Sequence, residues 1–175
     1  MLERIMVVTR LKMLPRMGWL LKGIPNPESI ADHSYMVAFI TLLLAENLKS
    51  RGVKVNTEKA LKLAIVHDIA EAVITDLPLP AQLYLNKEEA ERLAFKEEFP
   101  EFMDLFEEYR RGNSIEAQLV KLADRIDMVI QAYIYGLSGS RNLGEFWKSL
   151  DEIEKLDISK YFSGLIKEIR RLKRD

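Results

Sequence analysis

The stretch from Leu61 to Asp76 places the strongest limit on what this chain can fold into. Its apolar residues recur at helical spacing, which predicts a buried or half-buried α-helix rather than a strand. Into this apolar pattern the sequence inserts His67, Asp68 and Glu71. Burying an imidazole and two carboxylates without partners is costly, and a bound cation would stabilise all three. The stretch therefore predicts a helical protein with a metal site beside its core.

The rest of the chain shows the same helical spacing and no convincing β-alternation, so we expect an all-α fold of about eight helices. Ser29 and Asp32 have the form of a capping box, and Thr57 can cap the following helix. Segment 15–27, with its prolines and glycines, is expected to be irregular. The expected helices cover residues 2–14, 29–49, 57–76, 86–99, 101–111, 114–136, 143–155 and 158–173.

Length and charge narrow the class of protein. A chain of 175 residues, 48% hydrophobic and 30% charged, has the size and balance of one soluble globular domain, here expected to span 1–175. The net charge of -1 argues against a dedicated binder of nucleic acid polymers, because affinity for a polyanion comes mostly from Lys and Arg. The sequence has no cysteine, which excludes disulfides, cysteine-based zinc sites and thiol nucleophiles.

The sequence also favours a cytoplasmic protein without a membrane span. Residues 1–12 interleave charged and apolar side chains and lack the apolar core of a signal peptide. The longest mostly apolar run, from Met36 to Ala45, is far shorter than the roughly 20 residues needed to cross a bilayer.

The candidate metal ligands lie on separate expected helices. The chain holds two histidines, His33 and His67, and each stands beside an aspartate. Asp124 lies on a third apolar helix. Imidazole and carboxylate together suit a divalent transition metal such as Mn, Fe, Co, Ni or Zn, without choosing among them. Four protein ligands would leave coordination positions for water and a substrate oxygen, as a hydrolytic metal site requires.

Each of these residues also has an ordinary structural explanation. An adjacent His-Asp pair is a weak signal by itself. Asp124 could pair with Lys121, three residues before it, and Glu71 could be a capped or solvated helix carboxylate. The metal interpretation is favoured because all of these charged residues fall on otherwise apolar helix faces.

Longer motifs carry a resemblance to the HD-domain superfamily of metal-dependent phosphohydrolases. Within that superfamily the chain resembles the 5'-deoxynucleotidases, which hydrolyse deoxynucleoside 5'-monophosphates. The resemblance covers roughly Leu11 to Tyr135 and implies a single HD domain. Its motifs are PRMGW at 15–19, PESIADHS at 27–34, AIVHDIAEAVITDLP at 64–78 and EAQLVKLADRIDMVIQA at 116–132.

The resemblance implies a metal site and a catalytic group. One divalent transition metal ion (Mn, Co, Fe, Ni or Zn) would be held by His33, His67, Asp68 and Asp124. Glu71 would work beside that metal as the acid/base group of the reaction.

The resemblance also implies a nucleotide site. Arg16 would hold the phosphate, Trp19 would pack near the sugar, and Asp76 would approach the deoxyribose. In bacterial members of the family the Arg and Trp are adjacent, whereas here Met17 and Gly18 separate them, in the R-x-G-W form of the eukaryotic branch.

Two other functions remain open beside the 5'-deoxynucleotidase interpretation, and a homodimer is expected. Another HD phosphohydrolase would act on a cyclic nucleotide, a nucleoside triphosphate or an alarmone, although two-metal members that cleave cyclic dinucleotides use histidines this chain does not have. A non-catalytic helical protein that binds a metal or a nucleotide would have no use for Glu71. The resemblance favours a homodimer, and the apolar residues of the two C-terminal helices are interpreted as core or dimer contacts.

Overall fold

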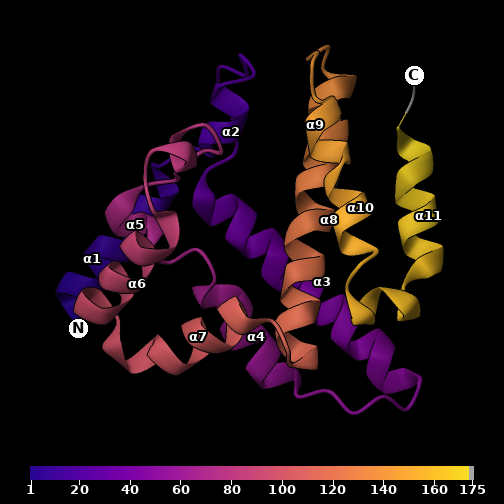
Figure 1. Cartoon of the computed structure of the whole chain (residues 1–175), viewed down its shortest axis with the longest axis horizontal. Coiled ribbons are helices and arrows are strands. Elements are labelled where there is room, and N and C mark those ends of the chain that lie inside the picture. Colours follow the sequence, from indigo (N-terminus) through magenta and orange to yellow (C-terminus); the bar gives the residue numbers. More distant parts are fainter. Residues whose placement is uncertain (174–175) are drawn as a thin grey trace.

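The computed structural model of the chain describes residues 1–173. Positions 174–175, the end of the expected domain, lie outside the described residues. The described chain is α-helical, and its β-type pairing is limited to one isolated bridge between Pro15 and Ser29 (Figure 1). The all-α prediction is confirmed. The α-helices are α1 (Leu2–Thr9), α2 (Met17–Leu20), α3 (Ile30–Ser50), α4 (Thr57–Val66), α5 (Glu71–Ile74), α6 (Lys87–Glu98), α7 (Met103–Arg111), α8 (Ile115–Leu137), α9 (Gly144–Trp147), α10 (Ser149–Ile153) and α11 (Ser163–Leu172). Short 3₁₀ helices cover Arg10–Lys12, Ala81–Leu83, Pro100–Phe102 and Asp157–Tyr161.

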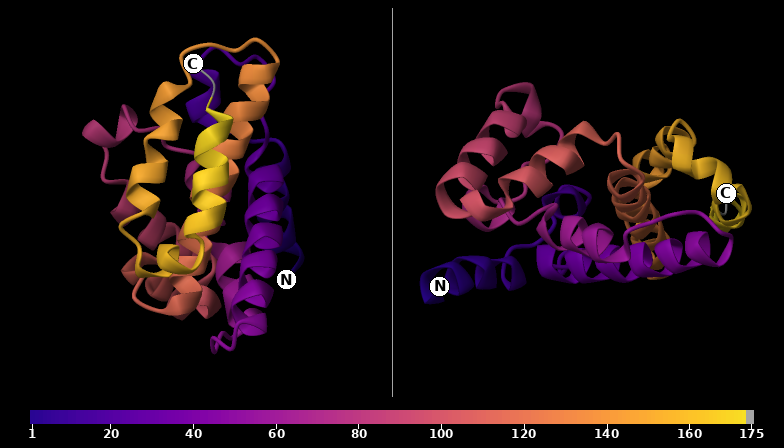
Figure 2. Two further views of the ribbon diagram at one scale, coloured as in Figure 1. Left: turned by 90° about the vertical axis from the view of Figure 1, so that its right-hand side faces the viewer. Right: turned by 90° about the horizontal axis from the view of Figure 1, so that it is seen from below.

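The two longest helices, α3 and α8, pack against each other and against α4 at the centre of the molecule. The C-terminal helices α10 and α11 lie along α8 at one end of the molecule's longest axis. Helices α1, α5 and α6 lie together at the other end (Figures 1 and 2). The two ends of the described chain are therefore far apart, and the long helices connect the two groups.

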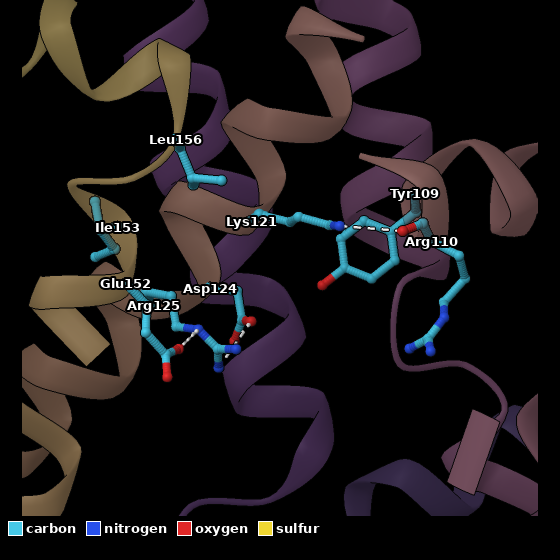
Figure 3. Close-up of a pocket in the computed structure, with 8 residues that line it drawn as sticks. All are labelled: Tyr109, Arg110, Lys121, Asp124, Arg125, Glu152, Ile153 and Leu156. Atoms are coloured by element: carbon cyan, nitrogen blue, oxygen red, sulfur yellow. Dashed lines mark hydrogen bonds and ion pairs between the residues drawn. The ribbon is translucent and has the colours of Figure 1, made fainter. Parts of the chain in front are cut away.

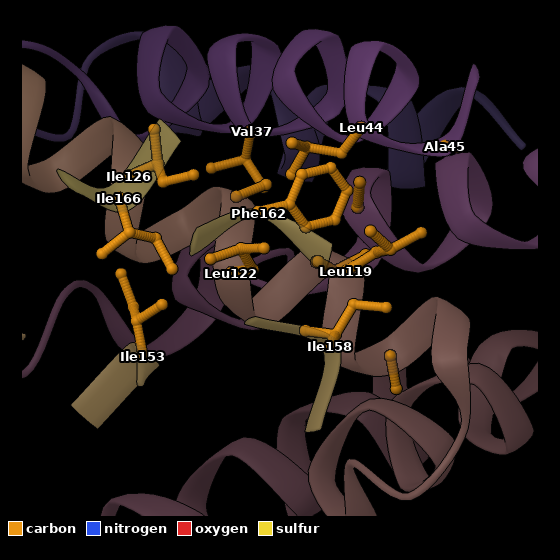
Figure 4. Close-up of a cluster of buried hydrophobic side chains, with 14 of the residues drawn as sticks. Val37, Leu44, Ala45, Leu119, Leu122, Ile126, Ile153, Ile158, Phe162 and Ile166 are labelled. Atoms are coloured by element: carbon orange, nitrogen blue, oxygen red, sulfur yellow. The ribbon is translucent and has the colours of Figure 1, made fainter. Parts of the chain in front are cut away.

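The main hydrophobic core fills the space between α3, α8 and the C-terminal helices (Figure 4). Burying one aliphatic or aromatic side chain of this kind contributes roughly 1.5–3 kcal/mol relative to leaving it in water. The sequence left open whether the apolar C-terminal residues contact the core or a second copy. Those that are buried here pack into the core of their own chain. The residues labelled in the figure are Val37, Leu44, Ala45, Leu119, Leu122, Ile126, Ile153, Ile158, Phe162 and Ile166.

Side-chain caps set the starts of the long helices, much as expected. The capping box of Ser29 and Asp32 is present at the start of α3, and Ser114 accepts a hydrogen bond from the Ala117 amide at the start of α8. The expected cap Thr57 is wrong: Asn56 caps α4 by accepting from the Lys59 amide, and Thr57 is the first helical residue.

The expected continuous helix over 57–76 is broken in the structure. α4 ends at Val66 and α5 begins at Glu71, and the residues between form a tight turn. There the Ile69 amide donates to the Val66 carbonyl at 3.2 Å and the Glu71 amide donates to the Asp68 carbonyl at 3.0 Å. Each of these bonds reaches three residues back, as in a 3₁₀ turn, which winds the chain more tightly than an α-helix does.

The outward face of α4 and α5 is more apolar than helical spacing indicates. Ile65 is 61% exposed and Val73 is also exposed, although both belong to the apolar pattern that predicted a buried helix. Single exposed apolar residues are common on protein surfaces, so the pattern located the helix but not all of its buried side.

Segment 15–27, expected to be irregular, contains the one-turn helix α2. Asp76 provides the reason, because its carboxylate accepts a hydrogen bond from the Met17 amide at 2.7 Å at the start of that helix. The partner is 59 positions away in the chain, so the local breaker content could not reveal it. In the described part of the chain, the helices are too short or too polar to cross a membrane.

Candidate active site

Four side chains expected to bind metal meet at one point. His33 comes from the first turns of α3, Asp124 from the middle of α8, and His67 and Asp68 from the turn after α4. The Nε2 atom of His33 lies 3.3 Å from Asp124 Oδ1, 3.6 Å from Asp68 Oδ2 and 3.4 Å from His67 Nε2. His67 Nε2 lies 3.2 Å from Asp68 Oδ2. Because the turn is tight, the neighbours His67 and Asp68 both reach this point.

These separations match a metal site. Ligand atoms held about 2.1 Å from one ion lie roughly 3.0–3.4 Å apart in octahedral or tetrahedral geometry. His33, His67 and Asp124 form a group whose ligand atoms all lie within 4.8 Å of one another. The Nδ1 atom of His67 bonds to the Ala64 carbonyl at 2.7 Å, which leaves Nε2 free to face the ion. The donor set and its spacing therefore fit a divalent transition metal.

Asp127 is a further part of this site that the sequence reasoning left without a role. Its Oδ2 lies 2.7 Å from His33 Nδ1, in the buried interior. A carboxylate on the far nitrogen of a metal-binding histidine orients the ring and fixes its tautomer. One available signal was the position of Asp127, three residues after Asp124 on a largely apolar helix.

Neighbouring charged groups favour a bound proton on the His33 imidazole and negative charge on Asp68. Burial and the charge of Arg16 act to lower the pKa of His33, but hydrogen bonds to Asp124 and Asp127 outweigh them and raise that pKa to about 9. Burial acts to raise the pKa of Asp68, but the charges of His67, Arg16 and His33 hold it well below its ordinary value.

Glu71 is the buried acid of the site. It is 1% exposed, and its Oε1 accepts a hydrogen bond from Lys87 Nζ at 2.9 Å. Its Oε2 is buried and has no hydrogen-bond partner among the described residues. Burial, together with the charge of Asp68, raises the pKa of Glu71 to about 8. A solvated helix carboxylate would show none of this, and an unpaired buried carboxylate oxygen beside a donor set is suited to handling a proton.

Arg16, just before α2, and Asp76, after α5, both lie near the metal-ligand candidates. Arg16 Nη1 lies 3.1 Å from Asp68 Oδ2, and the Asp76 carboxylate bonds to the backbone next to Arg16, at Met17. The structure thus brings a guanidinium and a further carboxylate to the edge of the donor set.

Trp19, which was expected to pack near the sugar, is a buried residue of α2. It is 1% exposed and packs between Tyr135 and Phe146, with ring centroids 5.2 Å and 4.0 Å away. Its indole N–H donates to Glu28 Oε1 at 2.9 Å. The ring has almost no free surface for a sugar, so its position is that of an anchor for the loop that carries Arg16.

A pocket of about 290 Å³ lies between α7, α8 and α10, with Asp124 among its lining residues (Figure 3). Lys121 lies in its wall and does not pair with Asp124; it donates to the Arg110 carbonyl at 3.2 Å and its ammonium lies 5.6 Å from the Tyr109 ring centroid. The ordinary explanation of Asp124 as the partner of Lys121 is therefore wrong. The lining residues are Tyr109, Arg110, Lys121, Asp124, Arg125, Glu152, Ile153 and Leu156.

The chain is similar to several curated proteins and solved structures. The curated 5'-deoxynucleotidase HDDC2 of Danio rerio is 34% identical over 148 residues, which are 77% of this chain and 69% of that protein. The 5'-deoxynucleotidase hdd1 of Schizosaccharomyces pombe is 33% identical over 156 residues, 79% of this chain and 75% of that protein. The crystal structure of the PH0347 protein from Pyrococcus horikoshii is 57% identical and superposes with a TM-score of 0.98, covering 99% of this chain and 100% of that one. A family model described as HD domain matches residues 8–163, and the chain belongs to the HD domain family.

Proposed function

We propose that this protein is a metal-dependent phosphohydrolase that removes the 5'-phosphate from 2'-deoxynucleoside 5'-monophosphates, giving a deoxynucleoside and phosphate. The observation that carries the proposal is the convergence of four imidazole and carboxylate groups beside Glu71, whose Oε2 is buried and unpaired in the described structure. The substrate class rests on the curated relatives, which are named 5'-deoxynucleotidases.

In this proposal His33, His67, Asp68 and Asp124 hold one divalent transition metal ion, among Mn, Co, Fe, Ni and Zn. The ion would supply Lewis-acid chemistry, lowering the pKa of a coordinated water and withdrawing charge from a phosphoryl oxygen. Glu71 accepts a proton from the attacking water or returns one to the departing 5'-oxygen. Burial raises the pKa of the Glu71 carboxyl to about 8 without the ion, and a nearby cation would lower that pKa toward neutral pH, where a general acid/base works best.

Arg16 and Asp76 hold the substrate in the proposal. Arg16 carries a positive charge next to Asp68, at 3.1 Å, and would stabilise negative charge on the phosphoryl oxygens during displacement. Asp76 would accept a hydrogen bond from the 3'-hydroxyl of the deoxyribose, while crowding at the 2'-position would disfavour ribose. Trp19 supports this arrangement through its packing, and direct contact with the sugar is not part of the proposal.

The pocket lined by Asp124 offers a binding site for the base of the nucleotide. The Tyr109 ring supplies aromatic surface, and Lys121 and Arg125 supply positive charge next to a metal ligand.

The test is phosphate release from a panel of 2'-deoxynucleoside and ribonucleoside 5'-monophosphates, with 3'-monophosphates and a cyclic nucleotide as controls. Each assay is run with Mn, Co and Mg after removal of bound metal by a chelator. Metal-dependent release confined to the deoxynucleoside 5'-monophosphates is the expected result. Turnover of the cyclic control in their place would assign another HD phosphohydrolase activity, and silence with every metal would favour the non-catalytic alternative.

We also propose that the protein is a homodimer. Apolar side chains form an exposed stripe along α3, made of Tyr35, Phe39 and Leu43 at intervals of one turn, with Phe39 46% exposed. A second copy would bury this stripe. Light scattering at micromolar concentration should give a mass near twice 20.3 kDa, and Phe39→Asp should return it to the monomer value.

A cytoplasmic location is the expectation from the sequence, and cell fractionation would test it. A single domain over 1–175 predicts one cooperative unfolding transition by calorimetry.

A further inference from the structure

We propose that Lys87 is a positioning residue for Glu71: its ammonium group holds one carboxylate oxygen so that the other is left free for proton transfer. The inference rests on the proposed function, because it adds a residue to the same reaction. None of the relatives' names and none of the sequence motifs points to Lys87.

The geometry at Glu71 is asymmetric. Lys87 Nζ lies 2.9 Å from Oε1, whereas Oε2 is buried without a hydrogen-bond partner in the described residues. A carboxylate with one oxygen held by a charge-assisted hydrogen bond is restricted about its terminal torsion, which is otherwise broad. The contact therefore defines which oxygen of Glu71 does the chemistry and where it stays.

The position of Lys87 in its helix also needs an explanation. Lys87 is the first residue of α6, after the Asn86 cap, where the partial positive charge of the helix N-terminus disfavours a cation. Two carboxylates offset this cost: Glu71, and Glu91 one turn later, whose Oε1 lies 3.3 Å from Nζ. Burial acts to lower the pKa of Lys87, but the charges of Glu71, Asp68 and Glu91 raise it above its ordinary value, so the ammonium stays charged.

Glu91 also anchors the lysine to the rest of the fold. Its other oxygen faces Arg110 of α7 at 3.5 Å. Lys87 is thus held between a site residue on α5 and a structural ion pair between α6 and α7. It approaches Glu71 from the side of α6, whereas the proposed metal ligands come from α3, α8 and the turn after α4.

The decisive variants are Lys87→Met and Lys87→Arg. With a deoxynucleoside 5'-monophosphate and saturating metal, Lys87→Met should lower kcat by about 10²-fold, the low end of what a positioned acid/base group contributes, with KM and bound metal within about twofold. Lys87→Arg keeps the charge and a donor and should recover most of kcat. Lys87→Ala should gain rate when ethylamine is added, which a lysine with a purely structural role would not show.

Lys59→Met is the matched control. Lys59 also bridges two carboxylates, at 2.9 Å from Glu108 Oε1 and 3.0 Å from Glu116 Oε2. These two partners have no place in the proposed site, so Lys59→Met should change the melting temperature and leave kcat near wild type. Wild-type kcat in Lys87→Met, or a loss explained by KM or by missing metal, would overturn the role of Lys87.

A readout without substrate or metal separates this inference from the proposed function. The melting temperatures of metal-free Lys87→Met, Glu71→Gln and the double variant form a cycle, and direct pairing predicts shifts that do not add. Additive shifts would overturn the pairing itself. If wild type hydrolyses none of the nucleotides, the proposed function fails, and the cycle still decides whether Lys87 holds Glu71.

Discussion

Asp127 offers the sharpest test of the metal site, because it touches a proposed ligand without binding the ion itself. Its Oδ2 lies 2.7 Å from His33 Nδ1, and both side chains are buried. Removing such a carboxylate partner typically weakens metal affinity 10- to 100-fold, or about 1.4–2.7 kcal/mol. Asp127→Asn keeps the volume and an oxygen acceptor but loses the charge, so we expect about 10-fold. Asp127→Ala also loses the acceptor and should approach 100-fold.

The assay is competition for Co²⁺ between the protein and a chromophoric chelator at fixed pH. Asp151→Asn serves as the control, because Asp151 pairs with Arg170 at 3.0 Å on the exposed surface and should leave affinity unchanged. If Asp127→Asn folds as wild type does and binds Co²⁺ within twofold of wild type, then Asp127 does not orient His33 for the metal, and its proposed role is wrong.

Three other predictions follow from the core, the titrating groups and the substrate loops. Leu122→Ala in the main core should cost about 2–5 kcal/mol of unfolding free energy, seen as a midpoint shift in urea denaturation, and a cost below 1 kcal/mol would contradict the packing. In the presence of a chelator, thermal stability should fall as pH rises. Folding raises the pKa of Glu71 from 4.5 to about 8 and the pKa of His33 from 6.5 to about 9. The folded state therefore keeps protons that the unfolded chain has already lost, and the stability that they contribute disappears as the pH passes through the folded-state pKa values. Melting scans between pH 5 and 10 that show rising stability would contradict this sign. Asp76→Ala removes the acceptor of the Met17 amide and should lower kcat/KM for deoxynucleotides about 10-fold, with a weaker preference over ribonucleotides. Steady-state kinetics that show both quantities unchanged would exclude Asp76 from the substrate site.

Local patterns predicted the helices well where the deciding interactions are themselves local. The Ser29 capping box joins residues three positions apart, and the Asn86 and Ser114 caps are equally short in range. The break between α4 and α5 was missed because the apolar helical spacing continues through it. The short helix α2 was missed because its first amide bonds to Asp76, 59 positions away.

The sequence by itself determined the helical class, the absence of thiol chemistry, and the set of imidazole and carboxylate groups from which a metal site could be built. Only the tertiary structure decided that Asp127 orients His33, across 94 positions, that Lys87 holds one oxygen of Glu71, and that Trp19 is a buried anchor. The physical reason is the sequence separation between the residues that interact. Helical periodicity relates residues three or four positions apart, whereas hydrogen bonds between helices depend on how the core packs.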